Sequence, residues 1–322
     1  MVHKALGHII PTNSTNHVLL IRPHYFFSNP QTATTNSFQQ TFGKASNAKK
    51  IHEEAMLEFD NIVKTLNDNG ITVSVINGPE GSPDAVFPNN VFSTHSEGIT
   101  VLYPMNAENR QAELTETLKN YLQHNYQTVK NYRAERDKGE RLEGTGSLVL
   151  DRLNKVAYAV LSPRTTPKML EKWGNEMDYS IVPFHALDDA GEDIYHTNVV
   201  MFVGTKVAAV CFDAIPNADE KAMVRKNLEE NGIEVVDLTQ DQLNNFCGNA
   251  IEIQTNEKEG VLLMSDTAYE ALSQEQKNIF ESYYSKIIHV DINTIERHGG
   301  GSARCMVAEI YGDRPKIQEK AL

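Results

Sequence analysis

Apolar residues along the chain follow two periods, one typical of strands and one typical of helices. The apolar run over residues 18–21 ends at Pro23, which predicts a buried strand over residues 17–23. Residues 51–69 then carry apolar side chains at helical spacing and end in Asn-Gly, a common helix stop. The alternating segment 71–75 predicts the next strand. The apolar positions that define the helix are Ala55, Phe59, Ile62, Val63 and Leu66.

The same order of helix, Asn-Gly and strand returns later, because residues 228–235 resemble residues 66–73. Strand and helix segments also recur at roughly 60-residue spacing, which is in the range of repeat architectures. Further strands are predicted at 98–103, 155–161, 180–184, 199–203, 206–212, 261–264 and 287–290, and further helices at 111–123, 167–177, 218–231, 267–272 and 273–284. No linker divides these segments. We therefore predict a single α/β domain of repeated strand–helix units over residues 1–322, with residues 1–15 as a polar N-terminal tail.

Composition and charge exclude several classes of partner. The formal net charge of −13 argues against nucleic acid, which requires a basic surface, and against anionic membranes. The longest apolar stretch, 198–212, is interrupted at 204–206 and is too short to span a bilayer. Three cysteines without a C-x-x-C spacing are typical of a reducing compartment, and no apolar signal segment opens the chain. We expect a cytoplasmic, soluble protein. Because the sequence has no zinc-binding spacing and no phosphate-binding loop, we expect the protein to need no metal and no cofactor.

The residues around Cys305 carry the strongest indication of chemistry. Three glycines at 299–301 free the backbone to adopt unusual conformations and to approach a ligand closely. The apolar run 306–308 predicts a strand directly after the cysteine. A thiolate at the mouth of such a loop can be stabilised and reached by substrate, so Cys305 is our candidate nucleophile. Cys247, within Asn-Phe-Cys-Gly-Asn, is the rival, and its surroundings indicate a loop that lines the site; Cys211 lies in an apolar strand and is predicted to be core.

Four further stretches hold polar residues at turns. Asp84 lies in a turn-rich loop between two strands, and Glu143 directly precedes a tight glycine turn. Arg164 follows a predicted strand, and His196 stands at the start of another. Each one alone has an ordinary structural explanation, such as a solvated turn residue or a hydrogen-bonded histidine at a strand edge.

Together, and in this chain order, the five stretches resemble the guanidine-modifying enzymes: arginine deiminases, dimethylarginine dimethylaminohydrolases and amidinotransferases. The shared order is an acidic loop, a Glu-Gly turn, Ser-x-Arg-Thr, a histidine strand and Gly-Gly-x-x-x-Cys, spread over residues 84–305. The resemblance implies the pentein fold, an α/β-propeller of five ββαβ units around a pseudo-five-fold axis with the active site in the central depression. It agrees with the repeat pattern and the chain length.

The resemblance also implies a role for each position. Cys305 would attack the planar carbon of a guanidino or ureido group, and His196 would protonate the leaving nitrogen and then activate water. Glu143 would orient His196 and bind a substrate nitrogen, and Arg164 would bind the substrate α-carboxylate. The residues that would close over the substrate side chain are Asp84 and Phe87.

Two substitutions separate this chain from the deiminases it resembles. Deiminase-type members clamp the guanidinium with an aspartate where this chain has Asn90, and arginine deiminases carry a second aspartate where it has Asn198. A buried cation requires carboxylate partners, whereas an asparagine offers both a donor and an acceptor and suits a neutral ureido group. The N-terminal segments 22–26 and 32–39 further resemble the citrulline-utilisation hydrolase branch.

The sequence therefore predicts a metal-free cysteine hydrolase of a non-peptide C–N bond in a free amino acid, with citrulline converted to ornithine, carbon dioxide and ammonia. An arginine or methylarginine deiminase-type hydrolase and an amidinotransferase remain alternatives within the enzyme class. A pentein that binds without catalysis is the alternative outside it. Whether the chain forms a homo-oligomer is left open.

Overall fold

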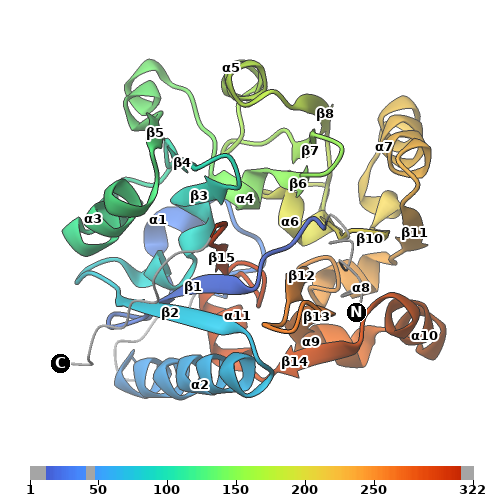
Figure 1. Cartoon of the computed structure of the whole chain (residues 1–322). Helices are drawn as coiled ribbons and strands as arrows, with labels where there is room; N and C mark the ends of the chain where they lie inside the picture. The colour runs from blue at the N-terminus through green and yellow to red at the C-terminus, as the bar shows by residue number, and fades with distance from the viewer. Residues whose placement is uncertain (1–11, 41–47, 313–322) are drawn as a thin grey trace, which may run out of the picture.

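The computed structural model describes residues 12–40 and 48–312 of the chain. Within these residues, fifteen strands form five three-stranded sheets. Figure 1 shows the sheets arranged around a centre, with one long helix on the outer side of each: α2, α3, α5, α7 and α10. The middle strand of every sheet pairs antiparallel with one neighbour and parallel with the other. This arrangement confirms the predicted five ββαβ units.

The first sheet is built from two distant parts of the chain. Its middle strand β1 (His17–Arg22) runs parallel to β2 (Thr72–Asn77), and α2 (Ala48–Asp68) makes the connection between them. The third strand is β15 (Ala308–Glu309), which pairs antiparallel with β1 through Val18 opposite Glu309. The segment that carries Cys305 is therefore anchored beside the first strand.

The other four sheets each use one continuous segment, with a hairpin followed by a helix and a parallel strand. They are β3 (Phe92–His95), β4 (Ile99–Leu102), α3 (Glu116–Asn125), β5 (Thr128–Asn131); β6 (Val149–Asp151), β7 (Val156–Val160), α5 (Pro167–Met177), β8 (Ser180–Phe184); β9 (Met201–Val203), β10 (Val207–Val210), α7 (Ala218–Glu230), β11 (Glu234–Asp237); and β12 (Ile251–Gln254), β13 (Gly260–Ser265), α10 (Gln274–Tyr283), β14 (Lys286–Val290).

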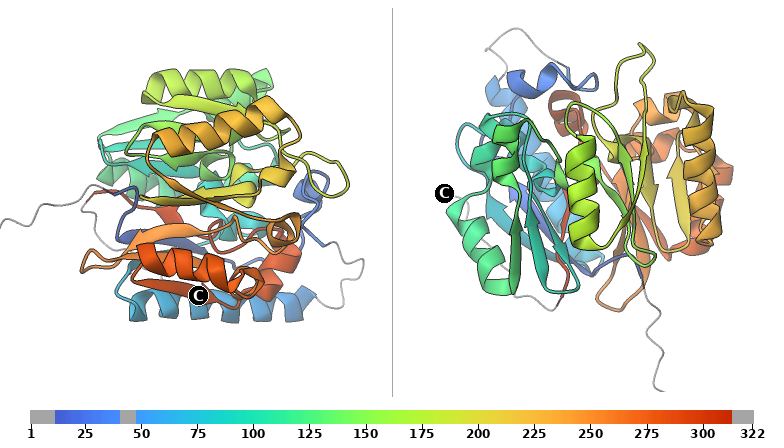
Figure 2. Two further views of the ribbon diagram at one scale, coloured as in Figure 1. Left: turned by 90° about the vertical axis from the view of Figure 1, so that its right-hand side faces the viewer. Right: turned by 90° about the horizontal axis from the view of Figure 1, so that it is seen from above.

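Shorter helices lie in the connections between strands. They are α1 (Pro30–Ala33), α4 (Gly144–Ser147), α6 (Thr197–Val200), α8 (Gln240–Asn244), α9 (Asp266–Ala271) and α11 (Asn293–Gly299), together with 3₁₀ turns at Pro83–Val86, Pro88–Asn90, Asn109–Glu113, Arg133–Lys138 and Phe212–Ala214. Figure 2 shows the sheets from the side and from above. Residues 37–38, ahead of α2, and residues 188–190, after β8, line one hollow.

The repeated Asn-Gly sequence has the same structural cause in both places. Gly70 and Gly232 end α2 and α7 with φ of +73° and +71°, a left-handed conformation that glycine adopts without strain. In each case the backbone amide three residues beyond the last helical residue donates back into the helix, from Ile71 to the Leu66 carbonyl and from Ile233 to the Leu228 carbonyl. This Schellman-type cap turns the chain from the outer helix into the parallel strand.

Apolar periodicity located the middle strand of each sheet correctly. The middle strands β1, β7, β10 and β13 are almost wholly buried because they are paired on both edges and covered by a helix. Helix α2 packs its predicted apolar face inward, with Val63 half-buried at the margin. Helix α5 spans the predicted residues, Pro167–Met177, and buries Trp173 completely.

Three predictions about local structure were wrong. Residues 199–200 belong to the helical turn α6 and only 201–203 form a strand, because an unbroken apolar run fits a buried turn as well as a buried strand. His196 accordingly precedes a helical turn. Residues 303–307 form successive turns, and the strand after Cys305 begins only at Ala308. Gly299 is the last residue of α11, so the glycine run begins inside a helix.

The hydrophobic pattern did not predict strand β3, because most of its residues are polar. Strand β3 is fully buried although it reads Phe-Ser-Thr-His, because the Ser93 hydroxyl bonds to His95 Nε2 at 2.9 Å and to the Tyr103 hydroxyl at 2.7 Å. Hydrogen bonding of this kind lets polar residues be buried at little cost.

Of the predicted tail over residues 1–15, residues 1–11 lie outside the described residues. Asn13 and Ser14 are buried, and Asn13 Nδ2 donates to the Gly204 carbonyl at 2.9 Å. In the described part of the chain, no helix has the length and apolar character needed to cross a membrane.

Candidate active site

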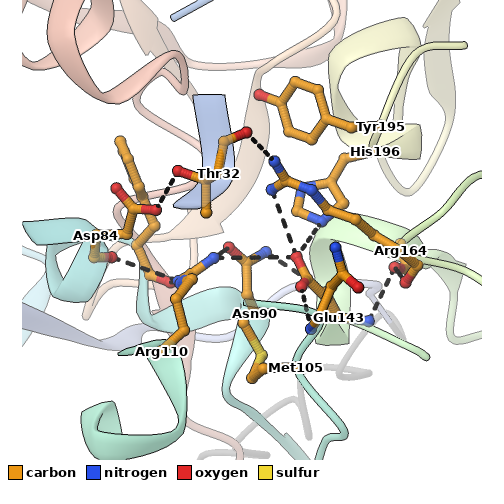
Figure 3. A network of polar contacts seen from close by, with 12 residues as sticks. Thr32, Asp84, Asn90, Met105, Arg110, Glu143, Arg164, Tyr195 and His196 are labelled. Carbon is orange, nitrogen blue, oxygen red and sulfur yellow. Dashed lines mark hydrogen bonds and ion pairs between the residues drawn. The ribbon is translucent and has the colours of Figure 1, made fainter. Parts of the chain in front are cut away.

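The predicted site residues come from the connections of different units and lie deep inside the protein. Asp84, Phe87 and Asn90 lie on the two 3₁₀ turns after β2, Glu143 precedes α4, and Arg164 follows β7. His196 and Asn198 lie at α6, and Cys305 lies between α11 and β15. All eight side chains are at most 4% exposed. Figure 3 shows how several of them converge from separate loops.

Glu143 and His196 form the central pair. The Glu143 Oε2 atom lies 2.8 Å from His196 Nε2, and Oε1 accepts a hydrogen bond from the Asn106 backbone amide at 2.8 Å. Burial favours the neutral acid, but the charge of Arg164 and the bond to His196 outweigh it and lower the pKa of Glu143 well below its usual range. Glu143 is therefore an anion, and its contact with Nε2 holds the His196 ring in one orientation.

The imidazole of His196 is neutral near pH 7. Burial is the largest effect and lowers its pKa to about 4, with Arg164 and Arg110 acting in the same direction and Glu143 opposing them. Since an ionised carboxylate only accepts hydrogen bonds, Nε2 carries the proton and Nδ1 keeps its lone pair. A Cβ atom at Gly146 would lie 2.8 Å from Nδ1, so the glycine leaves room for this nitrogen. His196 can thus accept a proton at Nδ1.

Arg164 is already engaged by the protein. Its Nε and Nη2 donate to the Thr35 hydroxyl at 3.1 and 2.9 Å, and Nη2 also donates to the Thr32 carbonyl at 3.1 Å. Its Nη1 lies 3.6 Å from Glu143 Oε2, and the guanidinium stacks over Tyr195 with the carbon 4.6 Å from the ring centroid. A carboxylate that binds Arg164 with both of its oxygens must therefore replace the Thr35 hydroxyl.

Asn90 is held in one orientation by an arginine that the sequence analysis did not identify. Arg110 Nη1 donates to Asn90 Oδ1 at 2.8 Å, and Arg110 Nε and Nη2 each donate to Glu113 at 2.8 Å (Figure 3). Arg110 is 2% exposed. The remaining amide nitrogen of Asn90 makes one long contact, 3.4 Å, to the Glu143 carbonyl. A Cβ atom at Gly146 would lie 2.3 Å from this nitrogen, which therefore lies on the same side as His196 Nδ1.

Asp84 has one satisfied oxygen and one free oxygen. Oδ2 accepts hydrogen bonds from Asn29 Nδ2 and the Thr32 hydroxyl, both at 2.9 Å. Oδ1 is buried and has no partner in the described part of the chain. A buried carboxylate oxygen without a donor is costly, so it is a natural acceptor for a ligand N–H group.

Phe87 lies against the glycine run and close to the cysteine. A Cβ atom at Gly301 would be 3.2 Å from the Phe87 ring and 3.3 Å from Cys305 Sγ. Gly300 has a φ of +64° and caps α11, and the Tyr195 hydroxyl bonds to its carbonyl. The glycines thus allow the aromatic ring, the loop and the thiol to pack together.

Cys305 Sγ accepts hydrogen bonds from two side-chain amides. Asn249 Nδ2 lies 3.2 Å and Asn198 Nδ2 lies 3.5 Å from the sulfur. Burial raises the pKa of the thiol, and these donors, together with Arg304, oppose the rise. Asn198, expected to bind substrate, therefore has its nitrogen on the nucleophile, while its Oδ1 is buried without a partner among the described residues.

Sequence reasoning missed Asn249, Arg110 and Thr35. Asn249 does lie in the stretch around Cys247 that was predicted to line the site, and it lies two residues beyond that cysteine. Arg110 is a buried charge, but nothing in the sequence separates it from a surface arginine.

The remaining cysteines and His298 have contacts that fit a structural role. Cys247 Sγ donates to the Ala268 carbonyl at 3.3 Å, and burial raises the pKa of this thiol to about 12. Cys211 is buried directly after β10, as predicted. His298 lies in the last turn of α11, with Nδ1 3.2 Å from the Ser28 hydroxyl. Among the described residues, no three His, Cys, Asp or Glu side chains are grouped to hold a metal ion.

Several solved structures share this fold. The N-terminal domain of ArgZ, an arginine dihydrolase from cyanobacteria, bound to substrate, aligns with a TM-score of 0.70 and 17% identity over 94% of this chain and 98% of that one. AgrE in complex with ornithine and NAD⁺ aligns with a TM-score of 0.73 and 15% identity over 94% of this chain. DDAH from Pseudomonas aeruginosa complexed with citrulline aligns with a TM-score of 0.62 and 15% identity, covering 91% of this chain and 98% of that one.

This chain spans only 41% of full-length ArgZ and 40% of AgrE. At these identities the likeness establishes the fold, and the fold is that of the penteins. A search of curated protein sequences gives no match.

The sequence profile of the eukaryotic N,N dimethylarginine dimethylhydrolases matches residues 22–312. The fold and this match define the class of the protein as a pentein of the family named for dimethylarginine dimethylhydrolases. The chain belongs to the dimethylarginine dimethylhydrolase family.

Proposed function

We propose that this protein is a cysteine hydrolase that cleaves the ureido C–N bond of a free amino acid, with citrulline as its preferred substrate. The products are ornithine, carbon dioxide and ammonia. The observation that carries the proposal is the orientation of Asn90.

Arg110 determines which atom of Asn90 faces the reaction site. A guanidinium only donates hydrogen bonds, so the Asn90 atom 2.8 Å from Arg110 Nη1 is the amide oxygen. With Oδ1 occupied, Asn90 presents its N–H groups on the side of His196 Nδ1. A ureido oxygen can accept such a hydrogen bond. A guanidinium has only N–H groups and gains nothing from it, which favours the neutral substrate.

The reaction follows from the residues already described. The Cys305 thiolate attacks the ureido carbon to form a tetrahedral intermediate. His196 takes up at Nδ1 the proton released when the Cys305 thiol ionises. The bond from the ureido carbon to the terminal nitrogen then breaks, and this nitrogen receives that proton from His196 and leaves as ammonia. His196 then deprotonates a water that attacks the thiocarbamate, which releases the Cys305 thiolate and a carbamate that decomposes to ornithine and carbon dioxide.

Buried charges match the two ends of an α-amino acid. The free Oδ1 of Asp84 is an acceptor for the α-ammonium group, and Arg164 is a donor for the α-carboxylate once Thr35 is displaced. Neither group of the substrate could be desolvated in this pocket without such a partner.

Arginine or a methylated arginine is the second candidate substrate. ArgZ, which shares the fold, is described as an arginine dihydrolase, and the family profile bears the name of dimethylarginine. The anions Asp84 and Glu143 are the groups that would attract a guanidinium. Amidino transfer to an amine is the remaining alternative, since it uses the same nucleophile.

The test is to incubate the protein separately with citrulline, arginine and methylated arginine and to measure ammonia, ornithine and citrulline. No amine acceptor is added, so ornithine and ammonia formed from citrulline report hydrolysis. Cys305→Ala provides the inactive control and should remain folded. We expect kcat/KM to be higher for citrulline than for arginine.

Asn90→Asp tests the basis of this preference, with Asn90→Ala as the matched control that removes the side chain without adding charge. The aspartate should lower citrulline turnover and raise arginine binding, because a carboxylate accepts from a guanidinium and cannot donate to a ureido oxygen. Hydrolysis of arginine by the wild type without turnover of citrulline would refute the proposed substrate. Full turnover by Cys305→Ala would refute the nucleophile.

A further inference from the structure

Asn249 contacts Cys305 at both its backbone and its sulfur. Its Oδ1 accepts the Cys305 backbone N–H at 3.4 Å, and its Nδ2 lies 3.2 Å from Sγ. The same nitrogen donates to the Asn198 carbonyl at 2.8 Å. Asn249 is completely buried, so both ends of its amide are used to join the α6 turn to the cysteine loop.

The orientation of this amide is fixed by its partners. A backbone N–H can only donate, so the Asn249 atom beside it is the oxygen, and the nitrogen must face the sulfur. Asn198 Nδ2 approaches the sulfur as a second donor at 3.5 Å. Among the described residues, these two amides provide the side-chain hydrogen bonds to Sγ. Both favour the thiolate, because a charged acceptor forms stronger hydrogen bonds than a neutral one.

We propose that Asn249 is a positioning residue that holds Cys305 in place and stabilises its thiolate before substrate binds, with Asn198 as a second, weaker donor. The inference rests on the proposed function in one respect, namely that Cys305 is the nucleophile.

A neutral substrate makes such donors necessary. A guanidinium would bring a positive charge next to the thiol and favour its ionisation. A ureido group brings no charge, so ionisation must be supported by the protein itself. Burial works against ionisation at this position, and the hydrogen bond from Asn249 is the largest of the effects that oppose burial.

The charged groups around the sulfur are few. Arg304 is next in the chain, and its guanidinium is bound to the Val307 carbonyl at 2.9 Å and to Glu309 at 3.0 Å. Tyr195 lies across the glycine loop, and burial raises its pKa well above the usual value, so it stays neutral. Arg304 is the cation whose charge favours the Cys305 thiolate, and this charge is shared with the Glu309 carboxylate.

The experiment measures alkylation of Cys305 by iodoacetamide without substrate, from about pH 7 to about pH 12, because burial already raises the pKa of this thiol. Mass spectrometry of the peptide that contains Cys305 separates it from Cys211 and Cys247. Wild type is compared with Asn249→Ala and with the isosteric Asn249→Asp, and circular dichroism reports folding. Asn245→Ala serves as the matched control, because Asn245 lies in the same segment and donates only to the Asp241 carbonyl at 2.8 Å.

We expect the midpoint of alkylation to rise by about one to two pH units in both Asn249 variants, as loss of one hydrogen bond to a charged group predicts. Asn198→Ala should give a smaller rise, and Asn245→Ala none. Citrulline turnover by Asn249→Ala should fall about 10- to 100-fold at pH 7 and recover at higher pH, which a merely structural role would not produce.

An unchanged midpoint in a folded Asn249 variant would overturn the inference. If neither Asn249 variant folds, Asn198→Ala decides in the same way. Because alkylation requires no substrate, this result is independent of which substrate is turned over, and turnover by Cys305→Ala tests the nucleophile separately.

Discussion

The protonation state of His196 predicts how the stability of the protein depends on pH. Its pKa falls from the ordinary value of 6.5 to about 4 in the folded protein. The unfolded chain therefore binds more protons between these two values, and the stability that His196 contributes is complete above pH 6.5 and is lost as pH falls through 4. Linkage over a shift of this size gives a loss of about 2 kcal/mol between about pH 7 and about pH 5.

The perturbation is His196→Asn, which removes the titrating ring. We expect the unfolding free energy of wild type to fall relative to that of the variant by about 2 kcal/mol when the pH is lowered from about 7 to about 5. Urea unfolding at each pH, followed by fluorescence and circular dichroism, measures the difference. Other histidines are present in both proteins, so their effects cancel. His185→Asn is the control at an exposed position.

The alternative arrangement gives the opposite sign. If His196 were an imidazolium paired with Glu143, its pKa would be raised, and wild type would become more stable relative to the variant as pH falls through the same range. If the unfolding free energy of wild type rises relative to that of His196→Asn as the pH is lowered, the neutral imidazole is refuted, and so is the assignment of Nδ1 as the proton acceptor.

Two further predictions concern the pocket walls. Gly146→Ala should reduce turnover strongly, because the added Cβ would lie 2.3 Å from Asn90 Nδ2 and 2.8 Å from His196 Nδ1, and kcat/KM compared with the thermal midpoint will show whether the loss exceeds any loss of stability. Arg164→Gln should weaken substrates that carry an α-carboxylate by roughly 1.5–3 kcal/mol, as expected for a charge-assisted bond. Decarboxylated analogues such as agmatine should lose little. Equal losses for both kinds of substrate would place Arg164 in the scaffold.

The sequence predicted the architecture well where burial follows a simple period. Helix α5 and strand β8 lie at the predicted residues, because the buried apolar side chains of each follow the period of a helix or of a strand. Strand β3 could not be found in this way, since its buried residues are polar and bonded to one another. Residues 306–307 were misassigned because apolar turns and apolar strands have the same composition.

The candidate site was predictable to the extent that its residues lie in recognisable motifs. Cys305, His196 and Glu143 could be named from the order of those motifs, and the structure places them at buried connections between strands and helices. Asn249 could not be assigned a role, because its importance comes from contacts to a residue 56 positions away in sequence. Arg110 likewise acts on Asn90 through a contact that no local pattern reveals.

The pairing of β15 with β1 also affects how the protein is made. On the ribosome, β1 leaves the exit tunnel long before β15, because Val18 pairs with Glu309 near the other end of the chain. Contacts between such distant residues form late in folding. Cys305 lies only three residues before β15. We therefore expect its hydrogen bonds to Asn249 and Asn198 to form only when β15 pairs with β1. A partly synthesised chain therefore lacks the two amide donors beside Cys305, and the thiolate that we propose can form only in the completed fold.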